Sequence, residues 1–110
     1  MKRNLELKYD GFENWLVGKE YRLGGVHYVF RFDNNRGASI VKFVGTIGHV
    51  ADLWELGVIY FGETNEDYLL DHNTPIADDV IGNLTDKEVC ELLARIRDLP
   101  VGFMVTPDSH

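Results

Sequence analysis

Residues 84–99, with the sequence LTDKEVCELLARIRDL, decide the fold of this chain. Thr85 and Glu88 have the spacing of a capping box, in which each side chain accepts a hydrogen bond from the backbone N–H of the other residue. Leu84 and Val89 flank this box with the spacing of a hydrophobic staple. The apolar residues recur at helical spacing and form one stripe: Val89, Leu92, Leu93, Ile96 and Leu99. Because proline cannot continue a helix, Pro100 ends the segment, and the sequence predicts an amphipathic helix over about residues 85–99.

This helix needs a partner surface, because a helix of this length is only marginally stable alone in water. The only candidate partner is the β-like sequence upstream, where we expect strands at residues 19–23, 26–32, 40–44, 53–61 and 68–70. Strands first and one helix last predict an α+β domain, in which an antiparallel β-meander of about five to six strands packs against the C-terminal helix. A small closed barrel is the main alternative architecture.

Two of the expected strands have distinct burial patterns. In residues 26–32 the apolar side chains share one face, as in a half-buried strand: Val26, Tyr28, Phe30 and Phe32. Residues 53–61 are almost continuously apolar, which is typical of a central strand buried on both faces. Gly57 within this run indicates either a bulge or the close approach of another element.

The N-terminal residues 1–18 form an element that the pattern defines poorly. Leu5 and Leu7 alternate with charged residues, as in a short edge strand. Phe12, Trp15 and Leu16 match one apolar face of a short helical turn.

The connections and the C-terminal end are irregular in pattern. Residues 62–67 predict an acidic turn. Residues 71–83 predict an irregular acidic connection that three apolar side chains hold to the core: Ile76, Val80 and Ile81. Residues 101–105 have the pattern of a last edge strand, and residues 106–110 are expected to form a flexible tail.

Length and composition indicate one folded domain over residues 1–110. Hydrophobic residues make up 45% of the chain and charged residues 26%, which is ordinary for a globular protein. No apolar run approaches the roughly 20 residues of a membrane helix, and the N-terminus lacks the apolar region of a secretory signal. We therefore expect a cytoplasmic protein that makes no contact with a membrane.

Cys90 is the single cysteine of the chain, so an internal disulfide and a multi-cysteine zinc site are excluded. It lies on the flank of the predicted helix stripe. Asp86, Glu88 and Glu91 surround it and are expected to raise the pKa of its thiol. We interpret Cys90 as a small packing residue of the helix flank, not as a reactive thiol.

The negative charge of the chain is concentrated in its second half. Residues 1–61 carry 8 Lys/Arg and 7 Asp/Glu, whereas residues 62–110 carry 3 Lys/Arg and 11 Asp/Glu. This asymmetry argues against a nucleic-acid binder, which needs basic residues against phosphates. Two interpretations stay open: a surface that keeps the protein soluble, or an acidic surface that binds a partner. The candidate residues for the second are Glu63, Glu66, Asp67, Asp71, Asp78 and Asp79.

The sequence contains no complete catalytic or metal-binding motif. Side chains that can bind a metal occur at Asp71, His72, Asp78 and Asp79, which we call the carboxylate and imidazole group. Their spacing matches no recognisable metal-binding motif. The residue types of a nucleophile and a base are present at His27, His49, His72 and Ser39, but Ser39 has no nucleophile-elbow motif around it. We therefore expect no catalytic residues, no bound metal and no cofactor.

Three segments resemble small acidic proteins of tailed bacteriophages: RGASIVK at residues 36–42, LWELGVI at 53–59 and NTPIADDVIGNLT at 73–85. The shared pattern has a Gly-Ala-Ser strand, a Leu-Trp/Phe-Glu-Leu strand and a Thr-Pro-Ile-x-Asp-Asp-Val segment before a capped helix. It covers roughly residues 19–99. The chain departs from it in residues 71–73 and 1–18. The group has no established activity, so the resemblance implies a phage origin and assigns no site residue.

Three functional hypotheses follow. The first is a phage-encoded accessory protein that acts as a non-catalytic binding module on a host or phage protein, through the acidic surface. The second is a structural or assembly protein that self-associates through an edge strand, either residues 101–105 or the strand that contains Trp54. The third is a small metal-dependent enzyme that uses the carboxylate and imidazole group.

Overall fold

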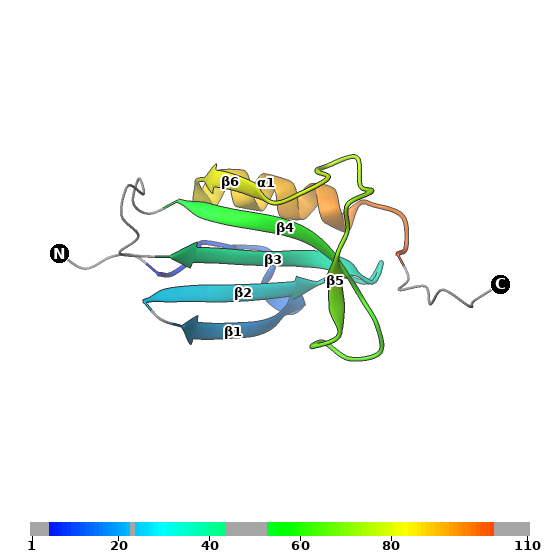
Figure 1. Ribbon diagram of the computed structural model, residues 1–110, viewed down its shortest axis with the longest axis horizontal. Coiled ribbons are helices and arrows are strands. Elements are labelled where there is room, and N and C mark those ends of the chain that lie inside the picture. Colours follow the sequence, from blue (N-terminus) through cyan, green and yellow to red (C-terminus); the bar gives the residue numbers. More distant parts are fainter. Residues whose placement is uncertain (1–4, 23, 44–52, 103–110) are drawn as a thin grey trace.

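The computed structural model describes residues 5–22, 24–43 and 53–102. The fold is α+β, as predicted: β1 to β5 form an open antiparallel sheet in chain order, β6 adds beside β4, and one helix follows (Figure 1). Because the sheet is open, the alternative of a closed barrel is wrong. The elements are η1 (Glu13–Trp15), β1 (Leu16–Arg22), β2 (Gly25–Arg31), β3 (Arg36–Phe43), β4 (Trp54–Phe61), β5 (Tyr68–Leu70), β6 (Ile81–Leu84) and α1 (Asp86–Arg97).

Helix α1 begins with the predicted capping box. The Thr85 hydroxyl accepts a hydrogen bond from the Glu88 backbone N–H at 3.2 Å, and the Glu88 carboxylate accepts one from the Thr85 backbone N–H at 3.0 Å. The helix ends at Arg97, two residues before the expected Leu99. Of the apolar stripe, Val89, Leu93 and Ile96 are fully buried, and Leu92 and Leu99 are partly buried. The stripe therefore packs on the sheet as its spacing predicted.

The sheet has one face under α1 and one face away from it. On β2, the predicted alternation is confirmed, because Val26, Tyr28 and Phe30 are buried in the same core cluster as the helix stripe. The intervening residues of β2 point to the opposite face, which we call the open face: His27, Val29 and Arg31.

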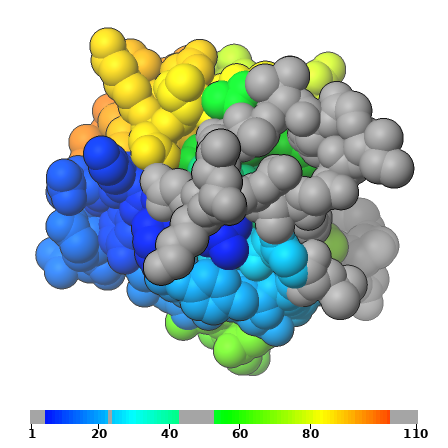
Figure 2. Space-filling model, turned by 90° about the vertical axis from the view of Figure 1, so that its left-hand side faces the viewer, coloured from blue at the N-terminus to red at the C-terminus, as the bar shows by residue number. Residues whose placement is uncertain are grey.

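Residues 5–9 form no strand, so the predicted edge strand at Leu5 and Leu7 is wrong. The segment lies beside α1 on the same side of the strands (Figure 2, blue and orange). Its backbone groups bond to a side chain and not to a strand edge: the Tyr28 hydroxyl donates to the Leu5 carbonyl and accepts from the Leu7 N–H, each at 3.2 Å. The helical turn expected near Phe12 and Trp15 is present as η1.

Strand β4 is central and buried on both faces, as predicted. Leu56 and Val58 belong to the core under α1, whereas Ile59 and Phe61 belong to a second, smaller cluster on the open face. The close approach inferred at Gly57 is also present, because a Cβ there would lie 2.6 Å from Cδ1 of Leu70.

Strands β5 and β6 both pair with β4 on the side away from β3, one near each end of β4. The connection between them therefore interrupts what would otherwise be one edge strand. Strand β6 was not predicted, because Gly82 and Asn83 break the alternation and Asn83 has a left-handed backbone (φ 59°). Ile76 and Ile81 pack against the core as expected, but the prediction for Val80 is wrong, since it is 49% exposed.

The expected strand at residues 101–105 is absent at Val101 and Gly102, and residues 103–105 lie outside the described residues. The predicted tail (106–110) also lies outside them.

Candidate functional site

The open face carries a groove of about 460 Å³, which we call the open-face groove. One side is formed by β1 and β2, and the other by the β4–β5 hairpin, which bends forward at one end of the sheet (Figure 1). The groove lies beside the smaller apolar cluster that Val29 and Tyr68 help to form. The lining residues are Val17, Gly18, Lys19, Glu20, Arg22, His27, Val29, Asn65, Glu66 and Tyr68.

Arg31 holds the hairpin in this position. Its guanidinium donates to the Asn65 side chain at 2.9 Å and to the Gly62 carbonyl at 3.2 Å, both in the turn before β5. It also donates to the Asn35 side chain at 2.6 Å and lies 4.7 Å from the centre of the Phe61 ring. A planar, multiply bonded guanidinium fixes its partners in orientation, so Arg31 sets the position of the groove wall.

His27 and Ser39 form a hydrogen-bonded pair on the same face. His27 Nε2 and Ser39 Oγ, from adjacent strands, are 2.7 Å apart. Partial burial, and then the nearby positive charge of Arg22, lower the pKa of His27. Glu20, which pairs with His27 across β1 and β2, opposes this shift but is itself bound to Arg22 at 2.8 Å. The environment of His27 therefore favours the neutral imidazole.

The surroundings of this pair do not match those of a hydrolytic dyad. Ser39 lies in the middle of β3, with Val29 beside it on one strand and Gly57 on the other. The backbone amides around it are thus used in the sheet, whereas acyl-transfer chemistry needs spare donors for an oxyanion. Of the other sequence candidates, His49 lies outside the described residues, and His72 bonds through Nδ1 to the Asp78 carbonyl, on the connection after β5.

The structure divides the six predicted acidic residues into two groups and a single residue. Glu63, Glu66 and Asp67 are exposed on the turn before β5, where Glu66 lines the open-face groove. These three carboxylates make no ion pair with any residue in the described ranges. The other exposed pair, Asp78 and Asp79, lies on the connection after β5.

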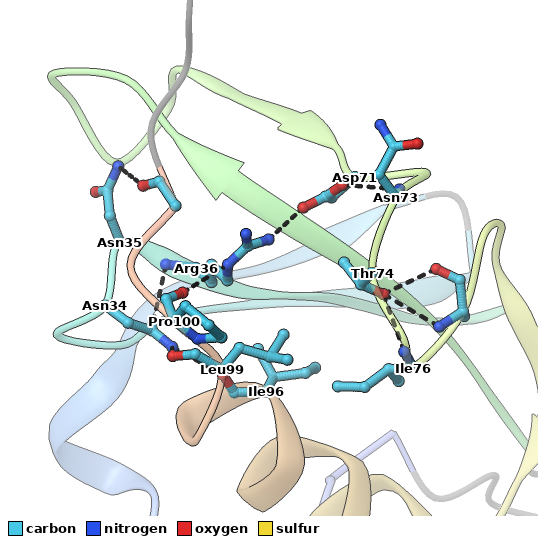
Figure 3. Close-up of polar contacts among 12 residues, drawn as sticks. Asn34, Asn35, Arg36, Asp71, Asn73, Thr74, Ile76, Ile96, Leu99 and Pro100 are labelled. Atoms are coloured by element: carbon cyan, nitrogen blue, oxygen red, sulfur yellow. Dashed lines mark hydrogen bonds and ion pairs between the residues drawn. The ribbon is translucent and has the colours of Figure 1, made fainter.

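Asp71 does not contribute an exposed charge. Its side chain is only 11% exposed and is bound to the Arg36 guanidinium (Figure 3). Asp71 also accepts a hydrogen bond from the Asn73 N–H at 2.9 Å. It therefore stabilises the connection after β5 and is unavailable to a partner.

A polar cluster next to the Arg36–Asp71 ion pair joins the β2–β3 turn to the C-terminal end of α1 (Figure 3). Buried Asn34 donates to the carbonyls of Ile96 and Leu99, each at 2.9 Å, and so connects the β2–β3 turn to the end of α1 and to the residues that follow it. The Arg36 guanidinium donates to the Pro100 carbonyl at 2.9 Å. No pattern in the sequence indicated this role of Asn34, so it was missed.

The remaining ligand-type side chains that the structure describes do not lie together in one cluster. In the described part of the chain, no group of three or more His, Cys, Asp or Glu side chains is arranged to hold a metal ion. The Asp79 carboxylate instead accepts a hydrogen bond from the Val80 N–H at 2.7 Å.

The Cys90 thiol donates to the Lys8 carbonyl at 3.1 Å. Burial, and then the charges of Asp86 and Asp10, raise the pKa of the thiol. The direction and the contribution of Asp86 agree with the prediction, but burial is the larger cause.

Comparison of the chain with protein-family models, curated proteins and solved structures gave no match. No helix within the described ranges has both the length and the apolar character needed to cross a membrane. The function is therefore argued from the open-face groove itself.

Proposed function

We propose that this protein is a non-catalytic binding module that holds an extended segment of a host or phage protein in the open-face groove. The observation that carries the proposal is the groove, a hollow of about 460 Å³ on the sheet face that α1 leaves uncovered. Its volume is within the range of ligand-binding clefts. Its elongated lining along β1 and β2 suits an extended polypeptide.

The charges at the rim favour a basic partner. Glu63, Glu66 and Asp67 place three carboxylates without ion pairs, within the described ranges, on the turn that forms one wall. Val17 and Val29 provide apolar lining between the charged sides. A segment with Lys or Arg beside an apolar side chain would be complementary to both features. The resemblance to tailed-phage proteins supports a partner in the cytoplasm of a bacterial host.

Charge reversal in two matched variants tests the proposal. The first variant, Glu63→Lys with Glu66→Lys, reverses the groove rim. The second, Asp78→Lys with Asp79→Lys, makes the same change in net charge on the connection after β5 and serves as the control. We expect a partner captured from bacterial lysate to bind the first variant roughly tenfold more weakly than wild type, and the control almost unchanged.

The salt dependence gives a second readout of the same capture. Attraction between exposed charges is screened at high ionic strength, so capture by the wild type should fall as salt is raised. Equal loss in both variants would show that only net charge matters. Full capture by the rim variant at all salt concentrations would contradict the proposed role of the groove.

A further inference from the structure

We infer that two copies of this chain pair through β1, antiparallel and centred on Tyr21. Strand β1 is an edge of the sheet, because β2 is its only partner strand among the described residues. An unpaired edge presents backbone donors and acceptors that another strand can satisfy. This inference does not depend on the proposed function, since it uses the backbone edge of β1 and a different occupant, although Glu20 and Arg22 also line the open-face groove.

The two edges expected from the sequence do not provide this surface. The strand that contains Trp54 is β4, which pairs with β3 on one side and with β5 and β6 on the other. Self-association through that strand is therefore excluded. Val101 and Gly102, the described part of the second expected edge, form no strand.

The backbone of β1 is suitably oriented around Tyr21. Arg22 pairs with Gly25 across a two-residue connection, and the closing pair of such a hairpin exchanges hydrogen bonds. Alternation along an antiparallel ladder then directs the N–H and C=O of Glu20 and Arg22 toward β2, and those of Lys19 and Tyr21 away from it. Tyr21 can therefore form a hydrogen-bonded pair with Tyr21 of a second copy.

The side chains around Tyr21 are self-complementary. In a two-fold antiparallel pairing centred on Tyr21, Glu20 of each copy lies opposite Arg22 of the other, on the open face. Opposite charges in such a cross-strand pair are favourable. In the single chain these two side chains form an exposed ion pair with each other at 2.8 Å.

Tyr21 provides the apolar centre of this pairing. At 57% exposure it is the most exposed large hydrophobic side chain in the described part of the chain. Its hydroxyl bonds to the Glu6 carboxylate at 2.9 Å, which holds the ring in a fixed orientation. The tyrosines of the two copies would meet on the side of the sheet that α1 covers.

Among the described residues, β2 is the only strand that pairs with this part of β1. In Figure 1 the arrowhead that ends β1 and the bent β4–β5 hairpin lie toward opposite ends of the sheet. A second β1 strand centred on Tyr21 would extend away from the hairpin. The resulting dimer would have one continuous sheet, with both open-face grooves on the same side.

Reciprocal charge variants test the pairing with purified protein alone. Glu20→Arg places Arg opposite Arg at both contacts, and Arg22→Glu places Glu opposite Glu. Sedimentation equilibrium over a wide concentration range should show a dimer for the wild type and at least a tenfold weaker association for each variant. An equimolar mixture of the two variants should dimerise again, because every Arg then faces a Glu.

The double variant Glu20→Arg with Arg22→Glu is the matched control. It has the wild-type composition and should dimerise like the wild type, whereas a general loss of folding would abolish association in the mixture and in the control. A wild-type protein that stays monomeric at millimolar concentration would overturn the inference. So would variants that associate as well as the wild type. A monomer that binds an unrelated β-strand peptide at β1 would show that the edge serves a foreign partner, which also overturns it.

Discussion

His27 illustrates how position in the sheet determines the chemistry of a side chain. In the sequence, His27 is one of several residues of a type found in catalytic sites. In the structure it is partly buried on the open face and bound to Ser39 at 2.7 Å. Burial and Arg22 both favour the neutral imidazole. The pair therefore ties β2 to β3 at the side of the groove.

This lowered pKa predicts a pH-dependent contribution to stability. Because the pKa of His27 is lower in the folded state, the unfolded chain binds the proton first as the pH falls. The contribution is complete above the unfolded value of about 6.5 and is lost as the pH falls toward the folded value. Urea unfolding of the wild type should give a lower free energy of unfolding at about pH 5.5 than at pH 7.5.

The variant His27→Gln keeps a hydrogen-bonding side chain beside Ser39 but cannot titrate, so it isolates this effect. Its free energy of unfolding should depend less on pH than that of the wild type over the same interval. An identical pH dependence in the two proteins would show that His27 does not cause it.

At the scale of elements, local signals predicted helix α1 best. Thr85 and Glu88 form their capping box within one turn, and the apolar stripe needs no distant information to be recognised. The strands β2 and β4 were predicted for the same reason, because alternation or continuous apolar character is visible in a short window. Strand β6 was missed because it exists only through pairing with β4, against the local preference of Gly82 and Asn83.

Asn34 links two elements, and its replacement should show how much that link contributes. In Asn34→Ala the carbonyls of Ile96 and Leu99 lose a buried donor. The Ile96 carbonyl keeps the Leu99 N–H as a donor at 3.1 Å, but leaving the Leu99 carbonyl unpaired costs about 1–3 kcal/mol, so the free energy of unfolding should fall by that amount. Urea denaturation should show a lower midpoint with an unchanged slope.

Asn73→Ala is the matched control, because the Asn73 side chain is exposed on the connection after β5. It should change the free energy of unfolding by less than about 0.5 kcal/mol. Similar losses in both variants would contradict the specific role of Asn34 at the end of α1.

At the scale of the whole molecule, the sequence predicted the layers and their order but not the site. An apolar helix face and an apolar sheet face must be buried together, which determined the α+β architecture. The open-face groove depends on the bend of the β4–β5 hairpin and on the bonds of Arg31 to Asn65 and Gly62. These contacts join residues about thirty positions apart, and no local pattern encodes them.

For the acidic residues, too, the sequence shows which residues are present, and only the fold shows where they lie. The composition showed that the second half of the chain is acidic, and six of its carboxylates were therefore predicted as a partner-binding surface. Only the fold separates the exposed carboxylates of the turn before β5, where Glu66 lines the groove, from Asp71, which is paired with Arg36. Charge counting alone could not make that separation, because it depends on which side chains the fold brings together.

The central claim is that the open-face groove is the surface that binds a partner, and site-specific photo-crosslinking tests it most directly. p-Benzoylphenylalanine replaces Tyr68, which lines the groove, or Tyr60, which points to the opposite face of the same hairpin. Irradiation in bacterial lysate should crosslink a partner from position 68 and not from position 60, with the yield falling at high salt. Equal crosslinking from both positions, or crosslinking from position 60 alone, would contradict the claim.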